Sequence, residues 1–293
     1  MTRSTILRGT MRSSILTIVL IVPIFVSGQS DATSRSWNQP VAPFRIAGNL
    51  YYVGASDITS FLLTTPDGHI VIDGGFEETA PQILANIEKL GFRPGDVRIL
   101  LNSHAHTDHA GGLAELRRVT GARVLASAGD TPLLERGGAG DPQFGDRFHF
   151  PPVHPDGEVR DGEPVSLGGV KLIPHLTPGH TPGCTTWSTT VKDADRSLDV
   201  VFVCSVTAPG YRLIGNERYP DAVADFRSSF ARLKKLTPDI PLGSHGSFFR
   251  LQEKIAAMKG GAQKNPFVDP DGYRKLITRL ERQFEAAVRE QSQ

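Results

Sequence analysis

Six consecutive residues carry the clearest chemical signal in this chain. Residues 104–109 read His-Ala-His-Thr-Asp-His, which places three imidazoles and one carboxylate in a single short turn. The apolar run at residues 97–102 precedes them and predicts a buried strand, so the backbone direction is set where the cluster begins. Imidazole and carboxylate donors suit zinc, and a catalytic zinc keeps one coordination position open for water. Six neighbouring residues cannot close a tetrahedral site alone, so the pattern predicts a metal centre completed by distant residues.

Two more histidines have the setting that a metal ligand needs. His180 lies in Thr-Pro-Gly-His-Thr-Pro-Gly at residues 177–183, and His245 lies in Gly-Ser-His-Gly at residues 243–246. Both turns follow apolar runs, and their small residues let the backbone approach an ion while the imidazole projects from it. A lone turn histidine is interpreted as structural, but the cluster requires partners. We therefore expect His180 and His245 to be ligands, and we expect structural or surface roles for His69, His149, His154 and His175.

The length and charge of the chain limit its partners. Its 293 residues carry one chemical signature, which predicts a single large domain with a substantial core. Thirty-two basic and thirty-one acidic residues nearly balance, and neither sign forms a long run. The chain therefore lacks the basic footprint expected for binding nucleic acid or an anionic membrane. We expect a small-molecule substrate and a monomer.

The N-terminal residues have the pattern of a secretory signal peptide. Arg3, Arg8 and Arg12 precede an uncharged apolar stretch at residues 15–26, which is followed by Ser27 and Gly28. Twelve apolar residues are too few for an ordinary membrane span, which needs about 20. The expected organisation is a signal peptide at residues 1–28, a polar linker at 29–43 and one domain at 44–293. Export to the periplasm or the medium follows from this interpretation.

The two cysteines lie at the outer ends of a predicted hairpin. Residues 185–191 and 198–203 are interpreted as strands, and a hairpin centred near Ala194 would bring Cys184 opposite Cys204. Disulfides persist in exported proteins, which makes a bridge one alternative. Because cross-strand disulfide geometry is often strained, we expect two free, buried thiols instead.

The remaining pattern predicts two sheets packed face to face with helices outside, an α/β arrangement. Apolar runs predict further strands at residues 50–53, 60–65, 69–73, 123–126 and 170–176. Helical spacing predicts helices at residues 77–90, 110–119, 221–236 and 272–290. Residues 129–162 are rich in Gly, Pro and Asp and predict a long irregular segment. Its phenylalanines are consistent with a functional lid or with a loop pinned to the core.

The histidine motifs resemble those of the metallo-β-lactamase superfamily. The resemblance rests on His-x-His-x-Asp-His at 104–109, on the turn around His180 and on His245, and it covers about residues 44–260. It implies a four-layer αβ/βα sandwich with metals at one edge of the paired sheets. Many hydrolases of this superfamily carry a metal-bridging Asp near position 204, whereas residues 203–211 here read Val-Cys-Ser-Val-Thr-Ala-Pro-Gly-Tyr. That segment instead resembles subclass three of the class B β-lactamases.

The resemblance implies a site with two zinc ions per chain. The first zinc would be held by His104, His106 and His180, and the second by Asp108, His109 and His245. Ser205 and Thr207 would bind substrate, with Ser205 at the position of a cysteine ligand in other lactamase subclasses. Cys204 departs from the pattern, because an Asp usually precedes that serine. Neighbouring strand residues point to opposite faces, so only one of Cys204 and Ser205 can face the metals, and we expect Ser205.

The implied activity is hydrolysis of the β-lactam amide bond of penicillins, cephalosporins or carbapenems. A zinc-bound hydroxide would be the nucleophile, and Asp108 would orient it. One alternative is a hydrolase of the same fold that acts on lactones or thioesters, since a fold does not fix a substrate. Another is a zinc-binding protein without catalysis, although structural zinc sites are usually closed four-ligand sets rich in cysteine.

Overall fold

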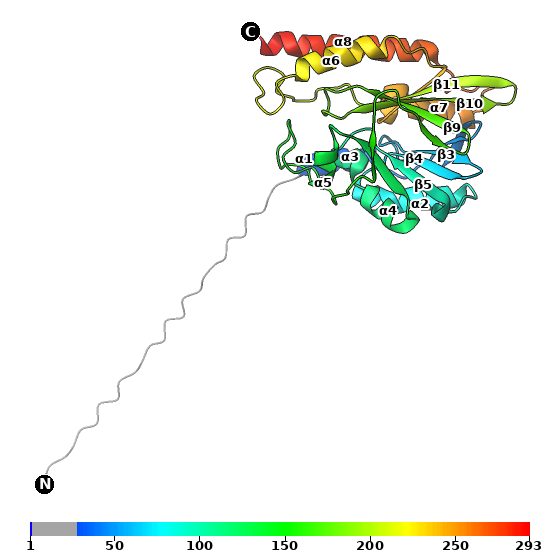
Figure 1. Cartoon of the computed structure of the whole chain (residues 1–293), viewed down its shortest axis with the longest axis horizontal. Coiled ribbons are helices and arrows are strands. Elements are labelled where there is room, and N and C mark those ends of the chain that lie inside the picture. Colours follow the sequence, from blue (N-terminus) through cyan, green and yellow to red (C-terminus); the bar gives the residue numbers. More distant parts are fainter. Residues whose placement is uncertain (2–27) are drawn as a thin grey trace.

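The protein is built from two packed β-sheets with helices on both outer faces (Figure 1). The computed structural model describes Met1 and residues 28–293, so the predicted signal peptide lies almost wholly outside the described residues. The seven-stranded sheet has the order β1 to β7 and consists of β1 (Phe44–Ala47), β2 (Leu50–Tyr52), β3 (Phe61–Thr65), β4 (Gly68–Ile72), β5 (Val97–Leu101), β6 (Arg123–Ser127) and β7 (Gly157–Val159). Its first four strands pair antiparallel and β4 to β7 pair parallel.

The second sheet has five strands in the order β12-β11-β10-β9-β8. They are β8 (Val165–Leu167), β9 (Val170–Leu176), β10 (Thr185–Asp193), β11 (Arg196–Val203) and β12 (Ile240–Gly243). Strands β10 and β11 form the predicted hairpin, with Asp193 opposite Arg196 and Ala194 in the left-handed region at the turn. Strand β12 pairs parallel to β11, so the C-terminal ends of both strands lie at the same edge of this sheet.

The helices cover the outer face of each sheet (Figure 1). Helices α2 (Ala80–Lys89) and α4 (Leu113–Thr120) pack on the seven-stranded sheet, and α6 (Ala222–Leu233) and α8 (Pro270–Gln291) pack on the five-stranded sheet. The other helical elements are α1 (Gly28–Trp37), α3 (Thr107–Ala110), α5 (Thr131–Glu135), α7 (Leu251–Lys259) and the 3₁₀ turns Glu77–Thr79, Pro94–Asp96 and Gly246–Phe249. No helix among the described residues is long and apolar enough to cross a membrane.

Alternation along the strands explains the layers. On β5, Ile99 and Leu101 point into the core between the sheets, while Leu100 faces the α2 and α4 side. On β11, Phe202 lies in the same central core, and Val201 packs toward α6 and α8. A strand buried on both faces reads as a continuous apolar run, which is why both were recognised in the sequence. The four-layer sandwich that we expected is therefore confirmed.

One expectation about local structure needs correction. The helix predicted at 110–119 begins only at Leu113, because Gly111 and Gly112 pass so close to the backbone of the segment 74–77 that no side chain would fit there. Most of helix α1 lies within the predicted polar linker at 29–43, and strand β1 begins at Phe44, directly after the linker. The end of α1 is tied down because the Trp37 carbonyl accepts hydrogen bonds from the backbone N–H groups of Asp57 and Ile58.

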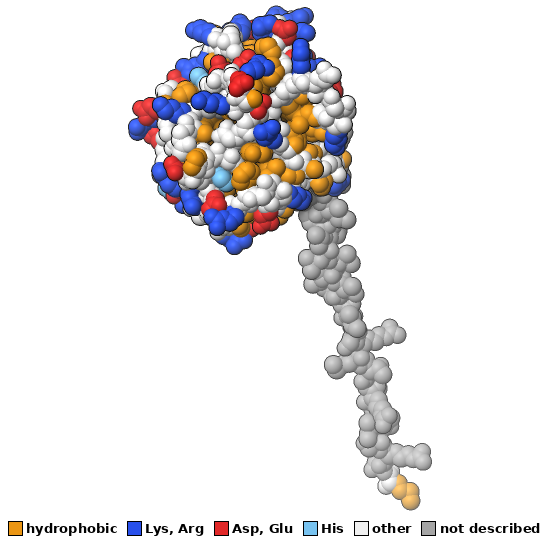
Figure 2. Space-filling view, turned by 90° about the vertical axis from the view of Figure 1, so that its right-hand side faces the viewer, with side chains coloured by type: hydrophobic (Ala, Val, Ile, Leu, Met, Phe, Trp, Pro, Cys, Tyr) orange, Lys and Arg blue, Asp and Glu red, His pale blue; other side chains and the backbone are white. Residues whose placement is uncertain are grey.

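The surface carries mixed charge. On the face shown in Figure 2, Lys and Arg side chains are interspersed with Asp and Glu side chains, and hydrophobic side chains gather near the middle. The view agrees with the nearly equal counts of basic and acidic residues in the sequence.

Candidate metal centre

The six predicted donors come from four segments that meet at one edge of the sandwich. His104 and His106 lie in the turn directly after β5, and the short helix α3 that follows carries Asp108 and His109. His180 lies in the loop between β9 and β10, and His245 directly follows Ser244 at the end of β12. The structure thus brings together all six residues that the sequence singled out.

The first three histidines converge on one point. His106 Nδ1 lies 3.1 Å from His180 Nε2, and the ring of His104 is centred 4.9 Å from that of His106 and 4.7 Å from that of His180. Two nitrogens bound to one tetrahedral zinc at roughly 2.0–2.1 Å would stand about 3.3 Å apart. The spacing of the ring nitrogens therefore fits a shared ion.

The second group converges on a carboxylate oxygen. Asp108 Oδ2 lies 3.2 Å from His109 Nε2 and 3.6 Å from His245 Nε2. His109 is fully buried, yet neither of its ring nitrogens has a partner with hydrogen-bond geometry among the described residues. Buried polar groups are normally satisfied, so an imidazole left this way beside a carboxylate fits a metal ligand.

Outer hydrogen bonds select which nitrogen of each imidazole faces the centre. His104 Nδ1 contacts the Ser103 hydroxyl at 3.0 Å, which leaves Nε2 toward the other ligands. His106 is reversed, because its Nε2 contacts Asp141 Oδ2 at 3.1 Å and its Nδ1 faces His180. Such partners hold the ring orientation and tautomer of a metal-binding histidine.

The two distant histidines are held in the same way. His180 Nδ1 lies 2.7 Å from the Thr207 carbonyl and can donate to it, so Nε2 points to the first group. His245 Nδ1 lies 2.9 Å from Asp57 Oδ2, and Asp57 also accepts the Ser247 backbone N–H at 2.6 Å. Sequence reasoning missed Asp57, because no spacing pattern links it to a histidine 188 positions away.

A buried aspartate joins the two loops that supply the first group. Asp130 Oδ2 accepts the Ala105 backbone N–H at 2.9 Å and the Thr181 hydroxyl at 2.8 Å, and Oδ1 accepts the Gly183 N–H at 2.8 Å. Asp130 is 1% exposed, and burial raises the pKa of its carboxyl despite these donors. In the sequence it lies in the segment 129–162 that was predicted to be irregular, and nothing there identified it.

Charge within the cluster separates neutral from ionised groups. Burial lowers the pKa of His104 and of His180, and neighbouring imidazoles lower both further, so these rings are neutral and able to bind a cation. Burial also opposes charge on His109, but Asp108 and Asp73 outweigh it and raise the pKa of His109 to about 10, so a metal ion bound there would have to displace a proton from this ring. Burial would raise the pKa of Asp108, yet His109 and His245 hold it well below its usual range.

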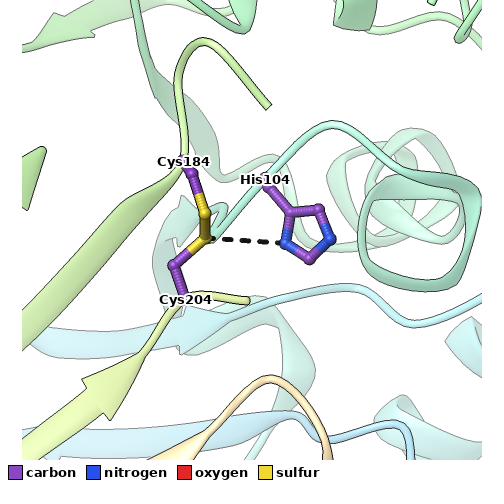
Figure 3. Close-up of side chains that lie close together, drawn as sticks. All are labelled: His104, Cys184 and Cys204. Atoms are coloured by element: carbon purple, nitrogen blue, oxygen red, sulfur yellow. Dashed lines mark hydrogen bonds between the residues drawn. A yellow bond between two sulfur atoms is a disulfide. The ribbon is translucent and has the colours of Figure 1, made fainter. Parts of the chain in front are cut away.

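The two cysteines form a disulfide directly behind His104 (Figure 3). The expectation of two free thiols was therefore wrong. Strand pairing ends at Trp187 and Phe202, so the cysteines lie beyond the ladder with their Cα atoms 6.0 Å apart. Cys204 Sγ lies 3.8 Å from His104 Nδ1, the same ring nitrogen that contacts the Ser103 hydroxyl (Figure 3).

Ser205 faces the opposite way and lines a cavity in front of the metal-centre residues. The cavity has a volume of about 590 Å³, and Thr207 lines it too, with its hydroxyl 2.9 Å from that of Ser205. Its apolar walls are aromatic side chains: Trp37, Phe76, Phe144, Phe148, Phe150 and Phe248. The segment at 129–162 is not wholly irregular as predicted, because it contains helix α5 and strand β7. Within it, Phe144 and Phe148 line the cavity, and Phe150 lines it too and is buried in the core.

Comparison with known proteins identifies close relatives of this arrangement. The sequence model of a family described as the Metallo-beta-lactamase superfamily matches residues 53–245. A Cronobacter sakazakii metallo-beta-lactamase with a HARLDQ motif is 43% identical, with 89% of this chain and 94% of that chain covered and a TM-score of 0.85. BJP-1, a subclass B3 metallo-beta-lactamase of Bradyrhizobium japonicum, is 39% identical, with 87% and 97% covered and a TM-score of 0.82.

Curated sequences match over a shorter stretch. A hydroxyacylglutathione hydrolase of Anaeromyxobacter dehalogenans is 32% identical over 127 residues, which are 43% of this chain and 40% of that protein. The chain therefore spans about two fifths of the length of this relative.

Proposed function

The chain belongs to the metallo-beta-lactamase superfamily, and from its site we propose that it is a zinc-dependent β-lactamase that opens the amide bond of penicillins, cephalosporins and carbapenems. The observation that carries the proposal is that five imidazoles and one carboxylate converge at an apolar cavity. Each imidazole is oriented by an outer hydrogen bond or by a buried carboxylate. Solved structures at 39% and 43% identity, both metallo-beta-lactamases, support it.

The residues fit two zinc ions. His104, His106 and His180 would hold the first, and Asp108, His109 and His245 the second. The orphaned nitrogens of buried His109 and the 3.1 Å separation of His106 and His180 are the fit test. Zinc bound there would supply Lewis acidity, which polarises a carbonyl and makes water a nucleophile near neutral pH.

The chain's own residues supply orientation. Asp108 is held ionised, so one of its carboxylate oxygens can accept a hydrogen bond from the attacking water. This bond would orient a lone pair of the water toward the carbonyl carbon. The Ser205 and Thr207 hydroxyls can donate to the carboxylate that β-lactams carry beside the lactam ring. The aromatic walls would exclude bulk water from the reacting bond, which strengthens each of these polar contacts.

Export is part of the proposal. The basic and apolar pattern at residues 1–28 favours a signal peptide, and the Cys184–Cys204 disulfide suits an oxidising compartment such as the periplasm. We propose that the mature protein works there as a monomer on a small-molecule substrate.

A second candidate is a thioester or lactone hydrolase. The curated relatives include a hydroxyacylglutathione hydrolase and an N-acyl homoserine lactonase, which favours this class over a non-catalytic zinc protein. Against it stands the segment at 204–205, where Cys204 is bonded to Cys184 and Ser205 faces the cavity, so no carboxylate bridges two metals there.

The test is turnover by the purified mature chain. Hydrolysis of a carbapenem and a cephalosporin is followed with zinc, after chelation and after zinc is restored, beside a glutathione thioester and an acyl homoserine lactone. The proposal expects lactam opening that chelation abolishes and zinc restores. His180→Ala should lose this turnover, whereas His175→Ala, a remote histidine bonded to Ser188, should keep it. Zinc-loaded protein that opens neither lactam but cleaves the thioester would replace the proposal by the second candidate.

A further inference from the structure

A line of aromatic rings leads from the metal-centre residues to the mouth of the cavity. The Phe144 ring is centred 5.4 Å from the ring of His106, and the Phe148 ring is centred 5.2 Å from Phe144. The guanidinium carbon of Arg147 lies 5.0 Å above the Phe148 ring. The cavity therefore offers an apolar track that begins at a metal-centre histidine and ends at a cation.

Arg147 is an uncommitted charge. Among the described residues that line this cavity it is the one Lys or Arg. Its side chain is exposed, and no ion pair or hydrogen bond to a described residue engages its guanidinium. The lining carboxylates of Asp57 and Asp141 each bond a histidine, and Asp108 faces two. The Arg147 backbone N–H donates to the Phe144 carbonyl at 3.2 Å, which fixes the turn that presents the side chain.

We propose that Arg147 binds an anionic group on the side chain of the substrate, so that the enzyme favours β-lactams with an aromatic side chain and a second carboxylate. This inference rests on the proposed β-lactamase function. The ring carboxylate of such a substrate would lie at Ser205 and Thr207, and its aromatic group would stack along Phe144 and Phe148. A guanidinium matches the two oxygens of a carboxylate with parallel N–H donors, which a lysine cannot do.

Two penicillins form a matched pair for the test. Benzylpenicillin and α-carboxybenzylpenicillin share the aromatic side chain and differ by one carboxylate. With the zinc-loaded full enzyme, Arg147→Ala should lower kcat/KM for the dicarboxylate by about three- to fivefold, through KM, as expected for a partly exposed ion pair. The kcat/KM for benzylpenicillin should change little. Arg147→Glu should lower kcat/KM for the dicarboxylate further than Arg147→Ala does. Arg147→Lys should retain part of the activity that Arg147→Ala loses.

Arg136→Ala is the matched control, because Arg136 is exposed in the same segment but bonds the Ala139 carbonyl and does not line the cavity. An equal effect of Arg147→Ala on both penicillins, or no effect on either, would overturn the inference. If the wild type opens neither penicillin, the proposed function fails, and calorimetric binding of the same two compounds then decides the role of Arg147. If Arg147→Ala weakened the binding of both penicillins equally, or of neither, the inference would again be rejected.

Discussion

Breaking the Cys184–Cys204 disulfide should cost the fold about 3 kcal/mol. The bridge joins residues 20 positions apart, and closing a loop of this size in the unfolded chain removes entropy worth about that free energy. The hairpin's strand pairs from Trp187 to Asp193 are separate from the bridge, so we expect its loss to act mainly by restoring conformational freedom to the unfolded chain.

The assay is urea unfolding of chelator-treated protein. Wild type is compared before and after reduction by a phosphine, beside the double variant Cys184→Ser/Cys204→Ser, which should be insensitive to the reductant. Reduced wild type should unfold about 3 kcal/mol more easily than oxidised wild type. Oxidised wild type no more stable than its reduced form would refute the reasoning. Repeating the series with zinc adds a second result: a larger difference would show that the bridge also holds the His180 loop for metal.

Two further predictions concern carboxylates. Asp130→Asn should lower the zinc affinity of the first site and destabilise the zinc-free protein by about 1–3 kcal/mol, because buried N–H and O–H donors lose an ionised acceptor. Chelator competition measures the zinc affinity, and urea unfolding measures the stability. Asp161 has its pKa lowered by Arg232, so its stabilisation exists above about pH 4 and is lost as pH falls through the folded-state pKa. Asp161→Asn should therefore cost up to about 1 kcal/mol at pH 7 and nothing in strong acid, as unfolding curves across pH would show.

The six candidate donors could be singled out in the sequence because their signal is local. His104 to His109 form a compact pattern, and His180 and His245 each have a turn of small residues after a strand. The sheets were predictable for the same reason, since strands such as β9 at Val170–Leu176 are read from their own residues. Short edge elements were missed, including β8 at Val165–Leu167, because three residues carry too little pattern to identify a strand.

The outer partners of the ligands could not be predicted, because their signal is spatial. Asp57, Asp130 and Asp141 are single aspartates in turns, where this residue type is common for reasons of backbone hydrogen bonding alone. Only the packed fold shows that each carboxylate meets a ligand or the loop that carries one. The disulfide was misjudged for a related reason. Its strain was considered as if the cysteines paired across a ladder, whereas they lie past its last pair, where the backbone is free to adapt.

Convergence, rather than burial of any single histidine, identifies this site. His69 is also buried and its Nδ1 also lacks a hydrogen-bond partner, but its ring packs edge-on against Phe92 and it belongs to no group of donors with metal-ligand spacing among the described residues. The ring nitrogens of His109 also lack hydrogen-bond partners, but His109 lies beside Asp108, and its ring is centred 4.2 Å from that of His104. A fold that keeps several polar groups buried and under-satisfied at one point is stabilised by whatever binds there. Metal that binds only the folded chain therefore raises its free energy of unfolding, and the stability of this protein should depend on zinc concentration.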